Sequence, residues 1–152
     1  MKMVLKTLSV GELRSPNSTA RHHSRQQRKK ARALFSEHGI VVPIIVDERM
    51  RIIDGVLRFE IAKELGLQEL NAVIVSNATE AKLLQLELSL NRLAEDSAWD
   101  TERLKTKFEQ LIEYNVDLTF TGFETAEIDN ILNFEEIEPE DQDWTATVPV
   151  TQ

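Results

Sequence analysis

The segment Arg51-Ile52-Ile53-Asp54-Gly55-Val56-Leu57-Arg58 is typical of a strand that runs through a glycine into a helix. Free backbone N–H groups point outward at such a helix start, and the helix dipole favours an anion there. Gly55 lets a phosphate approach the backbone closely, and the Arg58 guanidinium can contact phosphate oxygens as a fork. On this segment alone, an ordinary strand-to-helix turn with a surface arginine is the simpler interpretation.

Short apolar runs on both sides of this segment predict a small sheet. Strands are expected at residues 3–10, 43–46, 51–53 and 72–75, the middle two as a hairpin-like pair. Helices are expected at 24–38, 55–65, 77–94, 100–112 and 125–132, with Ser24, Asn77, Asp100 and Thr125 as N-caps. Because only helices follow the last strand, the order predicts an α+β fold with a small mixed sheet and a C-terminal helical part. Trp99 is expected in the core.

The charges are distributed unevenly along the 152 residues. Residues 1–107 hold all 18 basic residues and 14 acidic ones, a net charge of +4, and the rest of the chain has a net charge of −12. A basic N-terminal part followed by an acidic C-terminal part indicates a polyanionic partner for the N-terminal part. The candidate nucleic-acid contacts are Arg21, Arg25, Arg28 and Lys29. A solvated amphipathic helix explains the same charges equally well.

Composition excludes several classes of site. The sequence has no cysteine, which excludes disulfides, thiolate zinc sites and cysteine nucleophiles. No run approaches the roughly 20 apolar residues that a membrane span needs, and the N-terminus lacks the apolar region of a signal peptide. We therefore expect a cytoplasmic protein without a membrane partner. His22 and His23 are adjacent and lack a third ligand, so no metal site is expected.

Further motifs extend the pattern, and together they resemble a known family. They are Pro43-Ile44-Ile45-Val46, Ala62-Lys63-Glu64-Leu65-Gly66, Leu90-Asn91-Arg92-Leu93-Ala94, Trp99-Asp100, Leu118-Thr119-Phe120-Thr121-Gly122-Phe123 and Glu127-Ile128-Asp129. In this order they resemble the N-terminal domain of ParB partition proteins, also called the ParB-like nuclease domain and shared with sulfiredoxin. The later motifs resemble the subgroup attached to phage and plasmid DNA methyltransferases. The resemblance covers about residues 1–134.

The resemblance implies a nucleotide or phosphate site made by Asp54, Gly55, Val56 and Arg58. ParB proteins bind CTP there, and sulfiredoxin and free-serine kinases of this fold bind ATP or ADP, so CTP or ATP with Mg²⁺ is the expected cofactor. Asn91 and Arg92 lie on the helix that closes over the nucleotide in ParB. In the family, the loop before the first helix often faces the nucleotide, so Arg21, His22 or His23 is an alternative nucleotide contact. The subgroup usually has a histidine after the glycine, where this chain has Val56. Val56 cannot accept a proton, so chemistry that relies on the histidine is not expected, whereas phosphate binding by the backbone and Arg58 can survive the change.

Three functions remain open at this point. The first is a nucleotide-binding module serving DNA partition or a DNA methyltransferase, with DNA, a methyltransferase or partition protein, or a second copy as partner. The second is an enzyme, either a small-molecule kinase or a metal-dependent nuclease using Asp54 and Glu60; the Glu60–Lys63 spacing also suits a plain helical ion pair. The third is a scaffold with a decayed pocket.

The expected organisation is an α/β nucleotide-binding core at 1–76, a helical extension of the same domain at 77–134, and an acidic tail or linker at 135–152. No helix-turn-helix and no methyltransferase motif are expected. Trp144, within the acidic tail, is a candidate partner contact.

Overall fold

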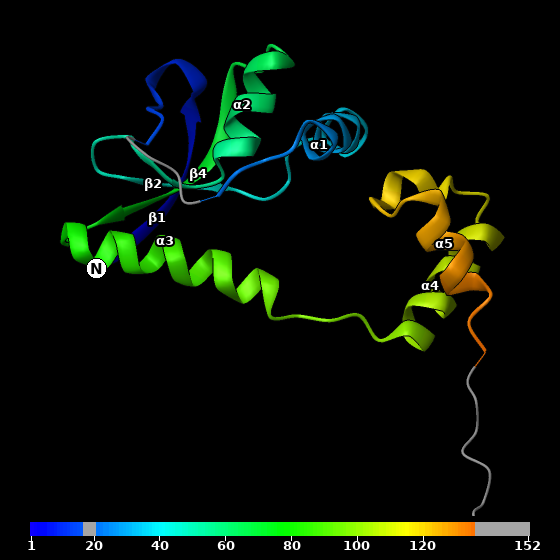
Figure 1. Cartoon of the computed structure of the whole chain (residues 1–152). Coiled ribbons are helices and arrows are strands. Elements are labelled where there is room, and N and C mark those ends of the chain that lie inside the picture. The colour runs from blue at the N-terminus through cyan, green and yellow to red at the C-terminus, as the bar shows by residue number, and fades with distance from the viewer. Residues whose placement is uncertain (17–20, 136–152) are drawn as a thin grey trace, which may run out of the picture.

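The computed structural model describes residues 1–16 and 21–135, and within them four strands form one sheet in the order β1-β4-β2-β3 (Figure 1). Their bounds are β1 Lys2–Ser9, β2 Ile44–Asp47, β3 Ile52–Asp54 and β4 Glu69–Ser76. β4 pairs with β1 in antiparallel and with β2 in parallel orientation, and β2 and β3 form an antiparallel hairpin. The predicted mixed sheet and hairpin are confirmed. The expected acidic tail and Trp144 lie outside the described residues.

Helices cover both faces of the sheet. The described helices are α1 Arg25–His38, α2 Val56–Glu64, α3 Glu80–Glu95, α4 Thr101–Glu113 and α5 Thr125–Leu132, with short 3-10 turns η1 Val10–Glu12 and η2 Leu118–Thr121. The first three are the helices that lie beside the sheet (Figure 1). Figure 1 shows α1 and α2 on one side of the sheet and α3 along the other. None of these helices is long and apolar enough to cross a bilayer.

Side-chain alternation along the strands divides the sheet's apolar residues between its two faces. Ile52 points into the larger cluster with Phe59 of α2, whereas its neighbour Ile53 packs with Val75 and with Leu83 of α3. The larger cluster also contains Leu8, Leu13, Ile44, Val46, Ala62, Leu70 and Ala72. The β3–α2 junction therefore lies between the two layers, and α3 runs past it.

The predicted helix starts are only partly correct. The Ser24 hydroxyl accepts a bond from the Gln27 N–H, and Asp100 caps α4 as predicted. Asn77 is not the cap of α3: it takes a left-handed conformation (φ 54°) in the turn after β4, and Thr79 accepts the N–H of Lys82 instead. Glu124, not Thr125, is the N-cap of α5, because its N–H is bonded to the Glu127 carboxylate in a capping box.

α4, η2 and α5 form the helical part, which has its own apolar cluster. Leu104, Phe108 and Ile128 are its buried residues, and Phe123 packs edge-on against Phe108 at 5.3 Å between ring centroids. Trp99 contacts Phe123 at a tilt, with 5.4 Å between ring centroids, but it is 71% exposed, so its predicted core position is wrong. A short extended segment, drawn between α3 and α4 in Figure 1, joins this part to the sheet domain.

Candidate functional site

A cleft of about 220 Å³ lies where α1, the β3–α2 junction and α3 meet. Five of the six residues predicted for the nucleotide site line it: Asp54, Gly55, Val56, Arg58 and Asn91. Arg21, predicted as a nucleic-acid contact, lines it as well. Sequence reasoning missed Gln27, Phe35 and Glu87, because nothing in the local pattern says that α1 and α3 converge on residues 54–58.

Gly55 makes the tight turn from β3 into α2. Its φ of 98° is a left-handed conformation that favours glycine, and it is the N-cap of α2. A Cβ at this position would lie 2.7 Å from Ile44 Cγ2 and 3.0 Å from the Arg58 Nη2. Because glycine has no side chain, it cannot itself cap the N–H groups of the first helical turn. Gly55 thus provides both the helix start and the space that Arg58 occupies.

Arg58 is folded back over Gly55 and bonded to Asp54. Its Nη2 donates to Asp54 Oδ2 at 2.6 Å and more weakly to the Pro43 carbonyl at 3.4 Å. Its Nε is buried and has no hydrogen-bond partner among the described residues. A buried unsatisfied donor costs about 1–3 kcal/mol. The guanidinium in the cleft therefore has one charge partner and one buried donor without an acceptor among the described residues.

α3 contributes the opposite wall of the cleft. Asn91 Oδ1 accepts a bond from Arg21 Nη1 at 3.2 Å, and its amide donates to the Glu87 carbonyl within the helix. This contact joins α3 to the segment before α1. Arg92 does not line the cleft: its side chain is 71% exposed and pairs with Asp96 at 2.9 Å and Glu95 at 3.6 Å on its own helix.

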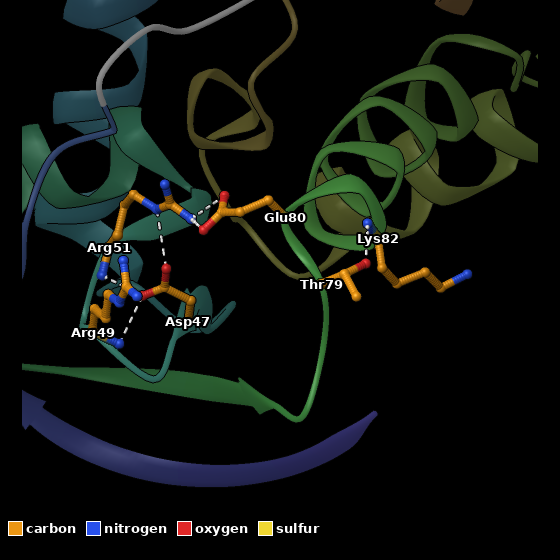
Figure 2. A network of polar contacts seen from close by, with 6 residues as sticks. All are labelled: Asp47, Arg49, Arg51, Thr79, Glu80 and Lys82. Carbon is orange, nitrogen blue, oxygen red and sulfur yellow. Dashed lines mark hydrogen bonds and ion pairs between the residues drawn. The ribbon is translucent and has the colours of Figure 1, made fainter.

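A polar network outside the cleft fixes the N-terminal end of α3 (Figure 2). Asp47 is only 4% exposed, and it accepts the N–H groups of Arg49 and Arg51 at 2.9 Å and the Arg51 Nε at 3.0 Å. Arg51 Nη2 in turn binds both carboxylate oxygens of Glu80, the first residue of α3, at 2.7 and 2.8 Å. The hydrogen bond that Arg51 donates to Glu80 raises the pKa of Arg51 above its ordinary value. The β2–β3 turn is thereby connected to α3.

The basic residues of α1 are largely paired with acidic residues. Arg28 pairs with Glu60 and Glu64 of α2, and Arg32 pairs with Glu64 at 3.2 Å. Hydrogen bonds from Arg28 and then Arg32 lower the pKa of Glu64. Of the predicted nucleic-acid contacts, Arg25 and Lys29 have no ion pair within the described part of the chain. Arg28 is occupied by α2.

The carboxylates considered for a nuclease are separated into ion pairs. Asp54 binds Arg58, and Glu60 binds Arg28 rather than forming the expected pair with Lys63. The Lys63 Nζ instead lies over the Phe59 ring, 5.4 Å from its centroid. In residues 1–16 and 21–135, no group of three or more His, Asp or Glu side chains is arranged to hold a metal ion.

Solved structures provide a comparison for this arrangement. The chain is similar to the C-terminally truncated ParB of Caulobacter crescentus complexed with CTP-γ-S, with a TM-score of 0.70 and 13% identity over 85% of this chain and 77% of that one. It also resembles two pNOB8-like ParB N-domain structures, with TM-scores of 0.55 and 0.51 and 21% and 22% identity. Each match covers 68% of this chain and 43% or 40% of the other.

The chain has the ParB/sulfiredoxin-like fold. In this ParB-like chain, residues 102–152 match the family described as ParB-methyltransferase HTH domain. That match corrects the prediction that the chain has no helix-turn-helix, and it includes most of α4 and all of η2 and α5. The sequence pattern missed this match because the helices of the segment are short and acidic. No Lys or Arg follows Lys107, so the segment lacks the basic residues by which a DNA-binding helix-turn-helix is usually recognised. A search of curated proteins found no match.

Proposed function

We propose that the cleft binds a nucleoside triphosphate, CTP or ATP, with its phosphates at the β3–α2 junction. The observation that carries the proposal is the buried, unpartnered Nε of Arg58 beside Gly55. A phosphate oxygen is a suitable acceptor for this donor, and the uncapped first turn of α2 supplies N–H groups to the same anion. The CTP-γ-S in the ParB structure of the same fold supports a nucleotide as the source of that phosphate.

Two other side chains in the cleft suit a triphosphate. Arg21 can turn from Asn91 toward the distal phosphates, since it is 42% exposed and its bond to Asn91 is 3.2 Å long. Val56 and Phe35 provide apolar surface. Val56 cannot take part in proton transfer, so binding, and not group transfer through this position, is the activity that the cleft supports.

A Mg²⁺ ion brought by the nucleotide fits the donors that are present. Mg²⁺ keeps several waters and commonly binds phosphates with only one or two protein oxygens. Glu87 and Asn91 line the cleft and offer a carboxylate and an amide oxygen from one face of α3. When bound, the ion would neutralise phosphate charge, and these two residues would orient it.

The same proposal places the chain in a DNA-directed system, either plasmid or phage partition or DNA methylation. The match to a methyltransferase-associated helix-turn-helix family supports this assignment, together with the ParB fold. A methyltransferase or partition protein and a second copy of the chain are the proposed protein partners. DNA contact is proposed for the basic residues before and within α1.

Isothermal titration with CTP, ATP and GTP in the presence of Mg²⁺ tests the proposal. Binding of CTP or ATP is expected, and Arg58→Ala should abolish it while the circular dichroism spectrum stays unchanged. Arg103→Ala is the matched control, because Arg103 is 85% exposed on α4 and pairs only with Asp100 among the described residues. Absence of binding by the native chain, or equal loss in both variants, would contradict the proposal.

A scaffold with a decayed pocket is the second candidate. It is favoured by the Asp54–Arg58 pair, which neutralises the guanidinium, and by Val56 at the position where the family subgroup usually has histidine. The titration separates the two functions, since a decayed pocket binds no nucleotide, whereas a functional cleft exchanges Asp54 for phosphate.

A further inference from the structure

The residues that match a helix-turn-helix family have the wrong charge for DNA. Residues 102–152 contain 13 acidic residues and three basic ones, and no Lys or Arg follows Lys107. In helix-turn-helix DNA readers, the second helix lies in the major groove between phosphate backbones. Duplex DNA carries about one negative charge per 1.7 Å of axis. An acidic helix is therefore repelled from that position.

The exposed surface of α5 carries acidic side chains. Glu124, Glu127 and Asp129 are all exposed, and the Glu127 carboxylate is already bonded to the Glu124 N–H. The three basic residues are at the start of α4, where Arg103 pairs with Asp100 and the Lys105 Nζ donates to the Phe134 carbonyl at 2.8 Å. The helical part thus presents no basic face to a duplex in the residues that the structure describes.

The helical part instead contacts the basic helix α1. Lys30 Nζ lies 3.1 Å from Glu124 Oε1, and His38 Nε2 is bonded to the Phe120 carbonyl at 2.8 Å. Leu34 packs against Gly122, where an added Cβ would come within 3.3 Å of Leu34 Cδ1. A cleft of about 310 Å³ at this contact is lined by both elements: Lys29, Lys30 and Leu34 from α1, and Thr119, Phe123, Glu124 and Thr125 from the helical part.

We propose that the helix-turn-helix part of this chain does not read DNA but acts as an acidic cover on α1, which a duplex must displace to reach Lys30. Arg28 and Arg32 are held by α2, so Arg25, Lys29 and Lys30 are the α1 charges left for phosphates. Glu124 of the cover pairs with Lys30, and the cover lies beside Lys29. The inference concerns only DNA contact and does not depend on nucleotide binding.

Two cysteine labels in the full-length chain can measure the separation of the two parts, because the native sequence has no cysteine. Ser36→Cys on α1 and Ala126→Cys on α5 are exposed positions suited to labelling. Adding a short duplex at low salt is expected to lengthen the distance between the labels. In NMR spectra of the same complex, the amide signals of α1 should shift because α1 contacts the duplex. Those of α5 should shift only because α5 separates from α1.

Glu124→Gln tests the cover itself, since glutamine keeps the N-cap acceptor but loses the ion pair. It should lengthen the label distance without DNA and tighten duplex binding roughly two- to fivefold, the range that an exposed ion pair supports. Lys30→Gln should lengthen the distance without tightening binding. Glu113→Gln, an equal charge change at the far end of α4, should alter neither.

Three outcomes would overturn the inference. One is a duplex that protects α5 from solvent. Another is equal tightening by Glu124→Gln and Glu113→Gln, which would mean that general charge, and not the contact with α1, governs binding. The third is absence of duplex binding by Glu124→Gln at low salt. None of these results bears on nucleotide binding, which the titration with CTP and ATP decides separately.

Discussion

Arg58 and Asp54 form an ion pair across Gly55, with Nη2 and Oδ2 2.6 Å apart and both side chains about one quarter exposed. The pair places a carboxylate where a phosphate would bind. Without a ligand, Asp54 neutralises the guanidinium and holds it over the glycine. If the cleft binds a nucleotide as proposed, its phosphate has to compete with Asp54 for Arg58, and the strength of this pair then sets the affinity for the anion.

Asp54→Asn should consequently tighten nucleotide binding. The substitution removes a negative charge from the cleft and frees Arg58, and partial exposure limits the gain to about 1 kcal/mol, or roughly fivefold in Kd. Titration with CTP and ATP measures it, with Asp100→Asn on the helical part as the control. Weaker binding in Asp54→Asn would show that the carboxylate holds Arg58 in the productive position instead of competing with the ligand.

Gly55→Ala should destabilise the fold more than the same change at Gly66. Both glycines have left-handed φ values, 98° and 71°, so alanine costs about 1–2 kcal/mol of backbone strain at either site. At Gly55 the new methyl also meets Ile44 at 2.7 Å, whereas nothing lies within 4 Å at Gly66. Overpacking adds about 1–3 kcal/mol at Gly55. Urea unfolding followed by circular dichroism measures the free energy of unfolding of both variants. Equal losses would show that the contact with Ile44 adds no cost at Gly55.

Arg51 should govern how firmly α3 is held. Arg51→Lys keeps the charge but loses the planar group that binds Asp47 through Nε and Glu80 through Nη2 at the same time, so amides in the first turns of α3 should exchange faster with solvent. Asn91 is 11 residues farther along α3, about 16 Å away, and small tilts at Glu80 are amplified there. Nucleotide affinity should therefore decrease in the same variant in which the amides of α3 lose protection from exchange.

Lys82→Gln is the control for Arg51→Lys, because Lys82 is in the same turn of α3 and its ammonium bonds only to Gln85 among the described residues. A double-mutant cycle between Arg51→Lys and Glu80→Gln should give a coupling of about 0.5–1 kcal/mol, limited by the 70% exposure of Glu80. Zero coupling would mean that the apolar contact of Leu83 alone holds the helix.

Local pattern was sufficient to predict most of the fold. Ser24 and Asp100 cap helices as predicted because an N-cap depends on residues three positions apart in the sequence. The cap errors at Asn77 and Thr125 are local, since a nearby residue caps the helix in each case. The other errors arise where distant segments meet. Glu60 was expected to pair with Lys63 on its own helix, but it pairs with Arg28 of α1 instead. Trp99 was assigned to the core, but it contacts Phe123 and stays 71% exposed.

The candidate site was predictable to a similar degree. Residues 54–58 are contiguous, so their glycine and arginine indicate an anion site without tertiary information. The sequence does not distinguish Glu87 from the other polar residues of α3. Glu87 lines the cleft only because Leu83, one turn earlier, packs on Ile53 and so fixes which side of α3 faces the cleft. Arg92 was selected because it follows Asn91, yet adjacent helical residues point about 100° apart, and only Asn91 faces the cleft.

Acid should weaken the contact between α1 and α2. Hydrogen bonds from Arg28 and Arg32 lower the pKa of Glu64 in the folded chain. A carboxyl group whose pKa is lower folded than unfolded stabilises the fold above its unfolded pKa, and that contribution disappears as the pH falls through the folded pKa. The free energy of unfolding should therefore decrease from pH 5 toward about pH 3, with Glu64 contributing to the slope.

Glu64→Gln should flatten this acid dependence because the titrating group is removed. Glu37→Gln on α1 is the control, since Glu37 is exposed and has no ion pair in the described part of the chain. Urea unfolding at a series of pH values provides the measurement. An unchanged slope in Glu64→Gln would assign the acid sensitivity to other carboxylates.

The chain by itself should be a poor nuclease. Phosphodiester hydrolysis needs a metal held by converging carboxylates and a positioned water. Asp54 and Glu60, the candidates for that role, are bound to Arg58 and Arg28, and a cation near either carboxylate would have to displace an arginine. Phosphate binding needs only helix-terminal N–H groups and arginines, so nucleotide binding is expected without appreciable DNA cleavage. Supercoiled plasmid incubated with Mg²⁺ or Mn²⁺ should stay intact, and nicking that is lost in both Asp54→Asn and Glu60→Gln would make the enzyme hypothesis the better one.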